Sequence, residues 1–245
     1  MRLKVKAMLR SIGVLFAATV ITGFFSVCAI IFDLVSPNQT RIHRIAQLWA
    51  DELLRLFGAK IVVLGRDNII VNSPVIFMSN HQGLFDILAL YRAVPVQFRW
   101  IIKKELFAIP LFGRAIKNAG YIKLDRKNRE NAIKDVEIAA QKIRGGTSIM
   151  TFPEGTRCVD GRIGEFKRGM FHLALQTGVP IIPITIVGAF EILNRLTAGV
   201  GEGRVVTVII GEPIETASYS TEMSGELIAR VRQAVVANYD KYTHY

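Results

Sequence analysis

Two short segments carry the residues best suited to chemistry. Residues 80–86 read Asn-His-Gln-Gly-Leu-Phe-Asp and place a histidine five positions before a carboxylate. Residues 152–157 read Phe-Pro-Glu-Gly-Thr-Arg and combine a rigid proline, a permissive glycine and fixed charge in one turn. The first segment offers a general base, and the second suits the binding of an anion. Neither is decisive alone, so the interpretation depends on whether the fold joins them in one site.

His81 and Asp86 can meet only in a particular local structure. Residues five apart in a regular helix lie roughly 140° from each other around its axis, so they share no helical face. The pair meets if His81 lies in the turn after a strand, eased by Gly83, and Asp86 lies in the first turn of the next helix. Asp86 would then orient the imidazole, whose other nitrogen is free to take a proton from a substrate hydroxyl. Alternatively, His81 caps the helix and Asp86 is a solvated carboxylate.

A metal site is not expected around His81. The other histidines of the chain, His43, His172 and His244, form no metal-ligand spacing with it.

The turn at residues 152–157 can aim Arg157 and backbone N–H groups at a phosphate, whose oxygens suit bidentate contact with arginine. Glu154 can accept a hydrogen bond from a substrate hydroxyl or hold Arg157 in its rotamer. The structural alternative is a surface ion pair between the two side chains, which would contribute little to stability. Lys103 and Arg126 add positive charge near the ends of two other expected strands. These residues together outline a basic pocket.

Alternating strands and helices are expected to position both segments. Strands are predicted at 60–64, 75–79, 99–102, 121–124, 148–152, 181–187 and 205–210, all short and rich in Val, Ile and Phe. Helices are predicted at 86–93, 111–118, 129–144, 167–177 and 221–239. This order predicts an α/β fold with a mostly parallel central sheet of about seven strands flanked by helices. Both segments directly follow strands, which is where sites gather in such sheets.

The N-terminal region has the composition of a membrane element. Residues 11–32 contain no charged residue and are preceded by basic residues, and about twenty apolar residues can cross a bilayer. The run is long for a cleaved signal peptide, and the preceding charges favour a cytoplasmic N-terminus. Residues 40–57 form an amphipathic pattern after a turn at 36–38. We therefore predict a membrane-anchoring helical hairpin over residues 1–57 and an α/β domain over 58–245, with spanning and interfacial placements both open.

Composition limits the class of partner. The chain has 245 residues, which fits one sizeable α/β domain, and its net charge of +11 indicates an anionic partner. Its basic residues are dispersed and match no nucleic-acid recognition motif, so an acidic membrane surface or a phosphorylated substrate is favoured over nucleic acid. The two cysteines, Cys28 and Cys158, are expected to be free thiols in a reducing compartment.

The sequence resembles the glycerolipid acyltransferase family, whose bacterial members include 1-acylglycerol-3-phosphate acyltransferases. His81 and Asp86 match its NHxxxxD motif, and residues 152–157 match its FPEGTR block in full. Residues 103–126 resemble its second block, and residues 179–183 resemble its fourth. Four blocks in order, from residue 80 to residue 186, cover much of the chain and make the resemblance highly specific.

The resemblance implies transfer of an acyl group from acyl-CoA or acyl carrier protein to the sn-2 hydroxyl of lysophosphatidic acid, giving phosphatidic acid for phospholipid biosynthesis. His81 would be the general base and Asp86 its orienting residue, with no covalent acyl-enzyme, metal or other cofactor. The residues implied to bind the acceptor phosphate are Lys103, Arg126, Glu154, Gly155, Thr156 and Arg157. Lys167 and Gly169 would assist less directly.

The same resemblance bears on location. Because the donor is cytoplasmic and the acceptor lies in the membrane, it implies the bacterial inner (cytoplasmic) membrane, with the catalytic domain on its cytoplasmic face. That placement favours a hairpin or interfacial arrangement over a single span. The alternatives are an enzyme for another lysolipid or glycerol-3-phosphate, a thiol-dependent acylase that uses Cys158, and a non-catalytic membrane lipid-binding protein.

Overall fold

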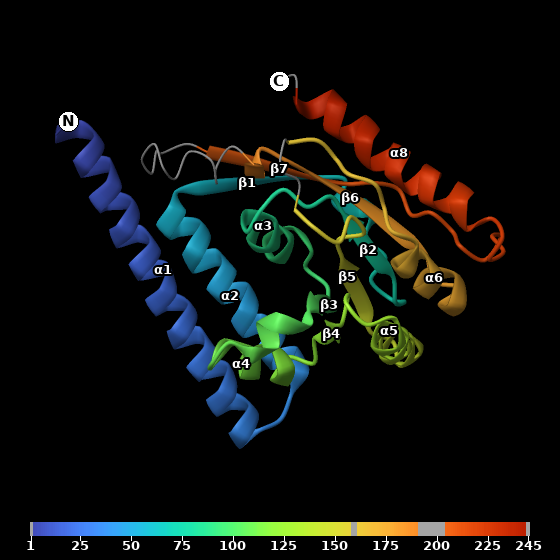
Figure 1. The fold of residues 1–245 in the computed structure, drawn as a ribbon, viewed down its shortest axis with the longest axis horizontal. Helices are drawn as coiled ribbons and strands as arrows, with labels where there is room; N and C mark the ends of the chain where they lie inside the picture. Colours follow the sequence, from blue (N-terminus) through green and yellow to red (C-terminus); the bar gives the residue numbers. More distant parts are fainter. Residues whose placement is uncertain (1, 158–160, 191–203, 244–245) are drawn as a thin grey trace.

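A seven-stranded sheet forms the centre of the molecule (Figure 1). The computed structural model describes residues 2–157, 161–190 and 204–243. Across the sheet the order is β1-β7-β6-β2-β5-β3-β4, and every neighbouring pair is parallel except the antiparallel β6 and β7. The strands are β1 (Ala59–Leu64), β2 (Ile76–Ser79), β3 (Phe98–Lys103), β4 (Ile122–Leu124), β5 (Ser148–Thr151), β6 (Ile181–Val187) and β7 (Arg204–Ile210). The predicted α/β fold with a mostly parallel sheet is confirmed.

Helices cover both faces of this sheet. They are α1 (Arg2–Val35), α2 (Gln39–Phe57), α3 (Phe85–Ala93), α4 (Phe112–Asn118), α5 (Arg129–Arg144), α6 (Arg168–Thr177) and α8 (Ser224–Thr243), with short 3-10 helices η1 (Arg66–Asn68) and η2 (Lys104–Ala108). Side chains alternate along β2, so Phe77 packs with α2 and α3, whereas Ile76 and Met78 pack with α5, α6 and α8. The last helix begins three residues later than predicted, and η2 was not predicted.

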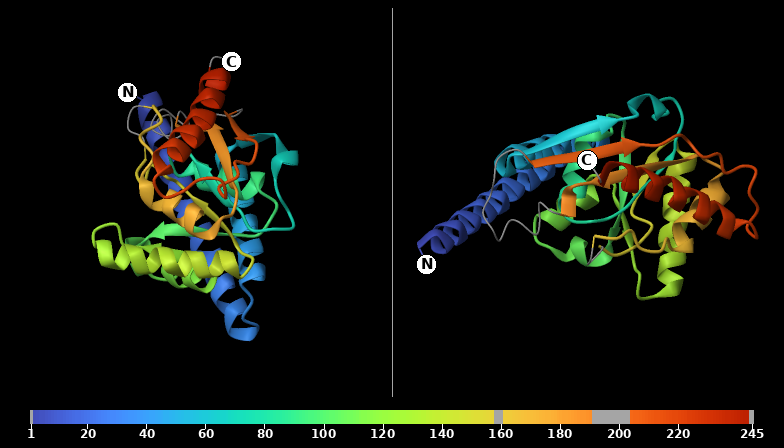
Figure 2. Two further views of the ribbon diagram at one scale, coloured as in Figure 1. Left: turned by 90° about the vertical axis from the view of Figure 1, so that its right-hand side faces the viewer. Right: turned by 90° about the horizontal axis from the view of Figure 1, so that it is seen from above.

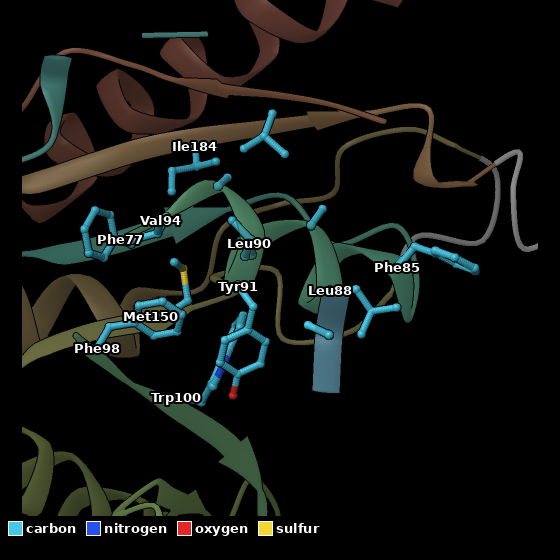
Figure 3. Packing of buried hydrophobic residues seen from close by; sticks show 14 of the residues in the cluster. Phe77, Phe85, Leu88, Leu90, Tyr91, Val94, Phe98, Trp100, Met150 and Ile184 are labelled. Carbon is cyan, nitrogen blue, oxygen red and sulfur yellow. The ribbon is translucent and has the colours of Figure 1, made fainter. Parts of the chain in front are cut away.

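The core between α3 and the sheet fixes the start of α3 (Figure 3). Phe85 and Leu88 are fully buried, together with Phe77 of β2 and Phe98 of β3. Burial of each such side chain contributes about 1.5–3 kcal/mol to folding. The Phe85 ring packs edge-on against Phe57 of α2, with centroids 4.9 Å apart, so the first turn of α3, which carries Asp86, is anchored in this core.

The two N-terminal helices pack side by side, as the predicted hairpin requires. Asn38 caps α2 by accepting hydrogen bonds from the backbone N–H groups of Thr40 and Arg41. Across the pair, Trp49 Nε1 donates to Thr22 Oγ1 at 3.0 Å, which fixes an antiparallel arrangement. Helix α2 also contributes buried side chains to the core that it shares with α3 and the sheet.

Within α1, the stretch Leu9–Val35 is long and apolar enough to cross a membrane, by length and composition. The N-terminal end of α1 projects beyond the rest of the molecule (Figure 2), and much of the helix carries exposed aliphatic and aromatic side chains.

Candidate active site

The predicted site segments all lie at one edge of the sheet. Strands β2, β5, β3 and β4 are consecutive neighbours and run parallel, so their carboxyl ends share an edge. Residues 80–86 follow β2, residues 152–157 follow β5, and Arg126 lies just beyond β4. Lys103 is the last residue of β3. The sheet order, which the sequence did not predict, is what brings these segments together.

His81 and Asp86 form the predicted pair. His81 lies in the turn after β2, Asp86 lies in the first turn of α3, and His81 Nδ1 is 2.8 Å from Asp86 Oδ2. Asp86 is 0% exposed and its partner ring is 14% exposed. Leu84, not His81, occupies the N-cap position of α3. The alternative of a helix-capping histidine beside a solvated carboxylate is therefore wrong.

The turn wraps around the Asp86 carboxylate. The same oxygen, Oδ2, also accepts hydrogen bonds from the backbone N–H groups of Gln82 at 2.6 Å and Gly83 at 2.8 Å. Because an ionised carboxylate only accepts, we infer that His81 Nδ1 carries the proton. His81 Nε2 is then an acceptor, and among the described residues it has no hydrogen-bond partner. This is the state that a general base requires.

The plane of the imidazole is fixed by stacking. The Phe152 ring lies parallel to the His81 ring, with centroids 3.9 Å apart and planes 9° apart, and Phe152 in turn lies 5.4 Å from Trp100. Phe152 is the first residue of the turn at residues 152–157, called the anion turn below, so this contact is one link between the two segments. This contact is not recognisable from the sequence, because a phenylalanine at the end of a buried strand is usual in any sheet.

Glu154 provides the second link. It is 4% exposed, and its Oε1 and Oε2 accept hydrogen bonds at 2.7 Å from the backbone N–H groups of His81 and Gly164. Burial raises the pKa of Glu154, and the two N–H bonds oppose that rise by favouring the carboxylate. A surface ion pair with Arg157 is therefore the wrong description of this residue. Its carboxylate holds the histidine turn, residues 80–84, against the segment that follows the anion turn.

Replacing Glu154 with alanine should reduce stability and turnover together. The change leaves the N–H groups of His81 and Gly164 without their acceptor, which costs roughly 1–3 kcal/mol of unfolding free energy for a buried donor. Chemical denaturation and kcat measurements check this, with the exposed Glu165→Ala as the matched control. Glu154→Gln should recover part of both losses, because its single carbonyl oxygen can accept one of the two bonds. Wild-type stability and kcat in Glu154→Ala would contradict the positioning role.

Basic side chains gather around the anion turn. The Arg126 guanidinium donates a hydrogen bond to the carbonyl oxygen of Gly155. The segment that follows β4 therefore contacts the segment that follows β5. Gly155 has φ +73°, a conformation that favours glycine, and a Cβ there would lie 3.1 Å from Lys167 Nζ, so this ammonium lies close to the turn. Thr156 and Arg157 are exposed at the end of the turn. The cations Arg126 and Lys167 thus lie beside the turn, and Arg157 extends from it.

Lys103 lies at the same sheet edge, where its ammonium is 3.8 Å from Glu105. Among the cations predicted for phosphate binding, Arg126 is in direct contact with the anion turn. Lys103 instead forms an ion pair with Glu105.

A buried aspartate supports the position of Arg126. Asp125 accepts a 2.7 Å hydrogen bond from Lys104 Nζ and another from Asn131, and the Lys104 bond is the main reason that the pKa of Asp125 falls to about 2. The backbone N–H of Asp125 donates to Asp135 of α5. This network fixes the chain immediately before Arg126.

Distant elements support the histidine turn in ways that the sequence did not reveal. The Asn80 side chain exchanges two hydrogen bonds with the backbone of Ile186 in β6, at 2.9 and 2.7 Å. Gln82 Nε2 donates to the Tyr239 hydroxyl at 2.8 Å, and that hydroxyl donates to the Gly161 carbonyl at 3.0 Å. No local sequence signal identifies such contacts, since Gln82 and Tyr239 are 157 positions apart.

Among the described parts of the chain, no three His, Cys, Asp or Glu side chains are grouped so that they could hold a metal ion. His244 and Cys158, both considered in the sequence analysis, lie outside the described residues.

The chain is similar to known acyltransferases. Residues 60–187, just over half of the chain, match the family model described as Acyltransferase. The 1-acyl-sn-glycerol-3-phosphate acyltransferase alpha of Homo sapiens is 31% identical over 87% of this chain and 75% of its own length. A chloroplastic 1-acyl-sn-glycerol-3-phosphate acyltransferase of Arabidopsis thaliana is 34% identical over 86% of this chain and 61% of its own length. The chain spans about half to three fifths of the plant and algal relatives that it matches.

A solved structure is similar over nearly the whole chain. The 1-acyl-sn-glycerophosphate (LPA) acyltransferase PlsC from Thermotoga maritima superimposes with a TM-score of 0.81 at 25% identity, covering 98% of this chain and 97% of the other. Family model, curated relatives and solved structure agree with the resemblance drawn from the four sequence blocks. This chain belongs to the acyltransferase family.

Proposed function

We propose that this chain transfers a fatty acyl group from an acyl thioester, on coenzyme A or acyl carrier protein, to the sn-2 hydroxyl of lysophosphatidic acid. The observation that carries the proposal is the His81–Asp86 pair, tied through Glu154 to the adjacent anion turn. This arrangement supports a site in which the base for the acceptor hydroxyl lies beside a binding site for the phosphate of the same acceptor molecule.

The geometry supports a direct transfer. His81 Nε2 takes the proton of the acceptor hydroxyl as its oxygen attacks the thioester carbonyl carbon, and Asp86 stabilises the imidazolium that forms. The carbon–sulfur bond then breaks, and the leaving thiolate takes the proton back from His81. The products are phosphatidic acid and the free thiol. Because a thiolate leaves readily, the sequence of steps needs no covalent acyl-enzyme.

The acceptor phosphate would bind at the anion turn. Arg157 provides a planar guanidinium suited to bidentate contact with phosphate oxygens, and Arg126 and Lys167 supply further positive charge beside the turn. Thr156 and the backbone at Gly155 complete the turn, and Lys103 adds a cation at the same edge. In this arrangement Glu154 acts by positioning the loops rather than by touching the phosphate.

The N-terminal helices would hold this site at the membrane. We infer that residues 1–57 anchor the α/β domain of residues 58–245 on the cytoplasmic face of a bacterial inner membrane, where both the acyl donor and the lipid acceptor are available. The apolar surface of α1 and the net charge of +11 support an association with anionic bilayers.

One assay tests the proposed reaction. Purified full-length protein is incubated with a radiolabelled acyl thioester and, separately, with lysophosphatidic acid, other lysolipids and glycerol-3-phosphate, and the products are separated. The expected result is label in phosphatidic acid. Preferential labelling of another acceptor would replace the proposed substrate, and the absence of transfer to any of them would overturn the proposed function.

Arg157→Ala should chiefly weaken the use of acceptors that carry a phosphate. Loss of one charge-assisted contact of about 1.5–3 kcal/mol corresponds to a rise in KM for lysophosphatidic acid of roughly 10- to 100-fold. Arg144→Ala, which removes an exposed arginine at the end of α5 remote from the anion turn, is the matched control and should change little. An equal loss with an uncharged monoacylglycerol acceptor would show that Arg157 does not recognise the phosphate.

A further inference from the structure

An exposed apolar tip lies between β3 and α4. It consists of residues 106–111, in which Leu106, Ile109 and Leu111 are 37%, 45% and 51% exposed. Ala108 and Pro110 between them are exposed as well. Three large aliphatic side chains in one short connection form a patch of the kind that marks an interaction surface.

The tip is held in a costly backbone conformation. Leu111 has φ 61° and ψ −57°, and it is the one residue other than glycine with positive φ in the described parts of the chain. The Phe112 N–H donates to the Pro110 carbonyl at 2.7 Å, which closes a strained γ-turn around Leu111. Strain of this kind costs about 1–3 kcal/mol and persists where the surroundings enforce it, often at functional sites.

Contacts on both sides of Leu111 hold it in this conformation. The Gly113 N–H donates to the Ile109 carbonyl at 2.7 Å, and any Cβ at Gly113 would overlap the carbonyl of Phe107. The tip is therefore held in one conformation, in which Leu106, Ile109 and Leu111 are exposed.

The tip is continuous with the proposed membrane helix. Helix α4 packs against α1 (Figure 1), and the chain just after α4 reaches the start of α2, where Gly120 lies beside the Gln39 side chain. The nearby C-terminal half of α1 carries its own exposed apolar residues, Val27, Ile31, Phe32, Leu34 and Val35. The tip thus extends an apolar surface that α1 already forms.

The charges around the tip indicate a lipid surface. Lys103, Arg114 and Lys117 flank it along the chain and are exposed. The acidic residue of this stretch, Glu105, is offset by its ion pairs with Lys103 and Lys127. Cations around an apolar insertion match anionic headgroups around hydrocarbon, as in interfacial membrane elements. A second copy of this chain would instead set like charges against each other.

We propose that residues 106–111 insert into the headgroup–acyl boundary of an anionic bilayer, as a second membrane contact beside α1. This rests on the proposed function in one respect, the placement of α1 in the membrane. The tip leaves the sheet at the carboxyl end of β3, the same edge as His81, so its insertion sets the site opening against the leaflet that supplies a lipid acceptor.

A fluorescence experiment on the full chain tests the insertion. In a Cys28→Ser, Cys158→Ser background, single cysteines at Ile109 or Leu106 are labelled with an environment-sensitive nitrobenzoxadiazole dye. The protein is added to vesicles of phosphatidylcholine and phosphatidylglycerol that contain lipids with nitroxide groups near the headgroup boundary. Ile133→Cys on α5, an aliphatic residue 62% exposed, is the matched control, and Phe24→Cys on α1 reports the anchor.

The expected result is loss of most of the dye emission at positions 109 and 106, with emission at 133 retained. Unquenched emission at 109 and 106 while position 24 is quenched would overturn the insertion. A blue-shifted but unquenched dye at 109 would overturn it too, since a second copy of the protein would then cover the tip. Quenching at no position would reject both this insertion and the α1 anchor. Because none of these readouts depends on turnover, failure of the proposed reaction is distinguished by the acyl transfer assay.

Discussion

Replacing His81 with alanine is expected to lower kcat by about 10²–10⁴-fold, the range that a positioned general base contributes. The acceptor hydroxyl then loses the group that removes its proton, whereas the anion turn keeps its contacts with Arg126 and Lys167. KM for lysophosphatidic acid should therefore change far less than kcat. Steady-state kinetics on purified protein with saturating acyl thioester measure both quantities.

The variant should fold and bind membranes normally. The hydrogen bond from the backbone of residue 81 to Glu154 does not depend on the side chain, and the imidazole is already partly exposed. His172→Ala on α6 removes an exposed histidine and serves as the matched control. If His81→Ala retained a substantial fraction of wild-type kcat, the general-base role would be rejected.

The His81–Asp86 pair could be predicted because its geometry is local. A strand, a short turn and the first turn of a helix are enough to bring the two side chains together, and residues 76–86 contain all three. Apolar periodicity likewise predicted the seven strands, because most are buried on both sides and read as runs of Val, Ile and Phe. Local sequence patterns were therefore enough to predict the strands and the His81–Asp86 half of the site.

The contact between the two halves of the site, residues 80–86 and residues 152–157, could not be predicted from local patterns. It depends on β5 lying next to β2, and on a buried carboxylate from one turn accepting a backbone N–H from the other, 73 positions away. For Glu154 the sequence indicated a substrate contact, a contact with Arg157 or a surface ion pair, because a charged residue in a turn is normally solvated. The stacking of Phe152 on the imidazole could not be predicted, because it requires a neighbouring strand whose identity the sequence does not specify.

Asp86→Asn should lower kcat while keeping the turn. An amide oxygen in place of Oδ2 can still accept from the N–H groups of Gln82 and Gly83. The amide nitrogen would fall at Oδ1, which is buried and has no partner among the described residues, so the variant should lose about 1–3 kcal/mol of unfolding free energy. Loss of the negative charge that stabilises the imidazolium during proton transfer should lower kcat by about 10²–10⁴-fold.

Asp86→Ala supplies the contrast. It leaves two backbone N–H groups and the ring N–H of His81 without an acceptor, at a cost of about 1–3 kcal/mol for each one that stays buried. This variant should lose more stability than Asp86→Asn, as well as kcat, whereas Asp67→Asn, an exposed aspartate in η1, should lose neither. Unfolding midpoints and kcat, measured for the three variants, distinguish the catalytic role of Asp86 from its structural role. Wild-type kcat in Asp86→Asn would mean that the charge of Asp86 does not assist the base, and that this residue serves only to shape the turn.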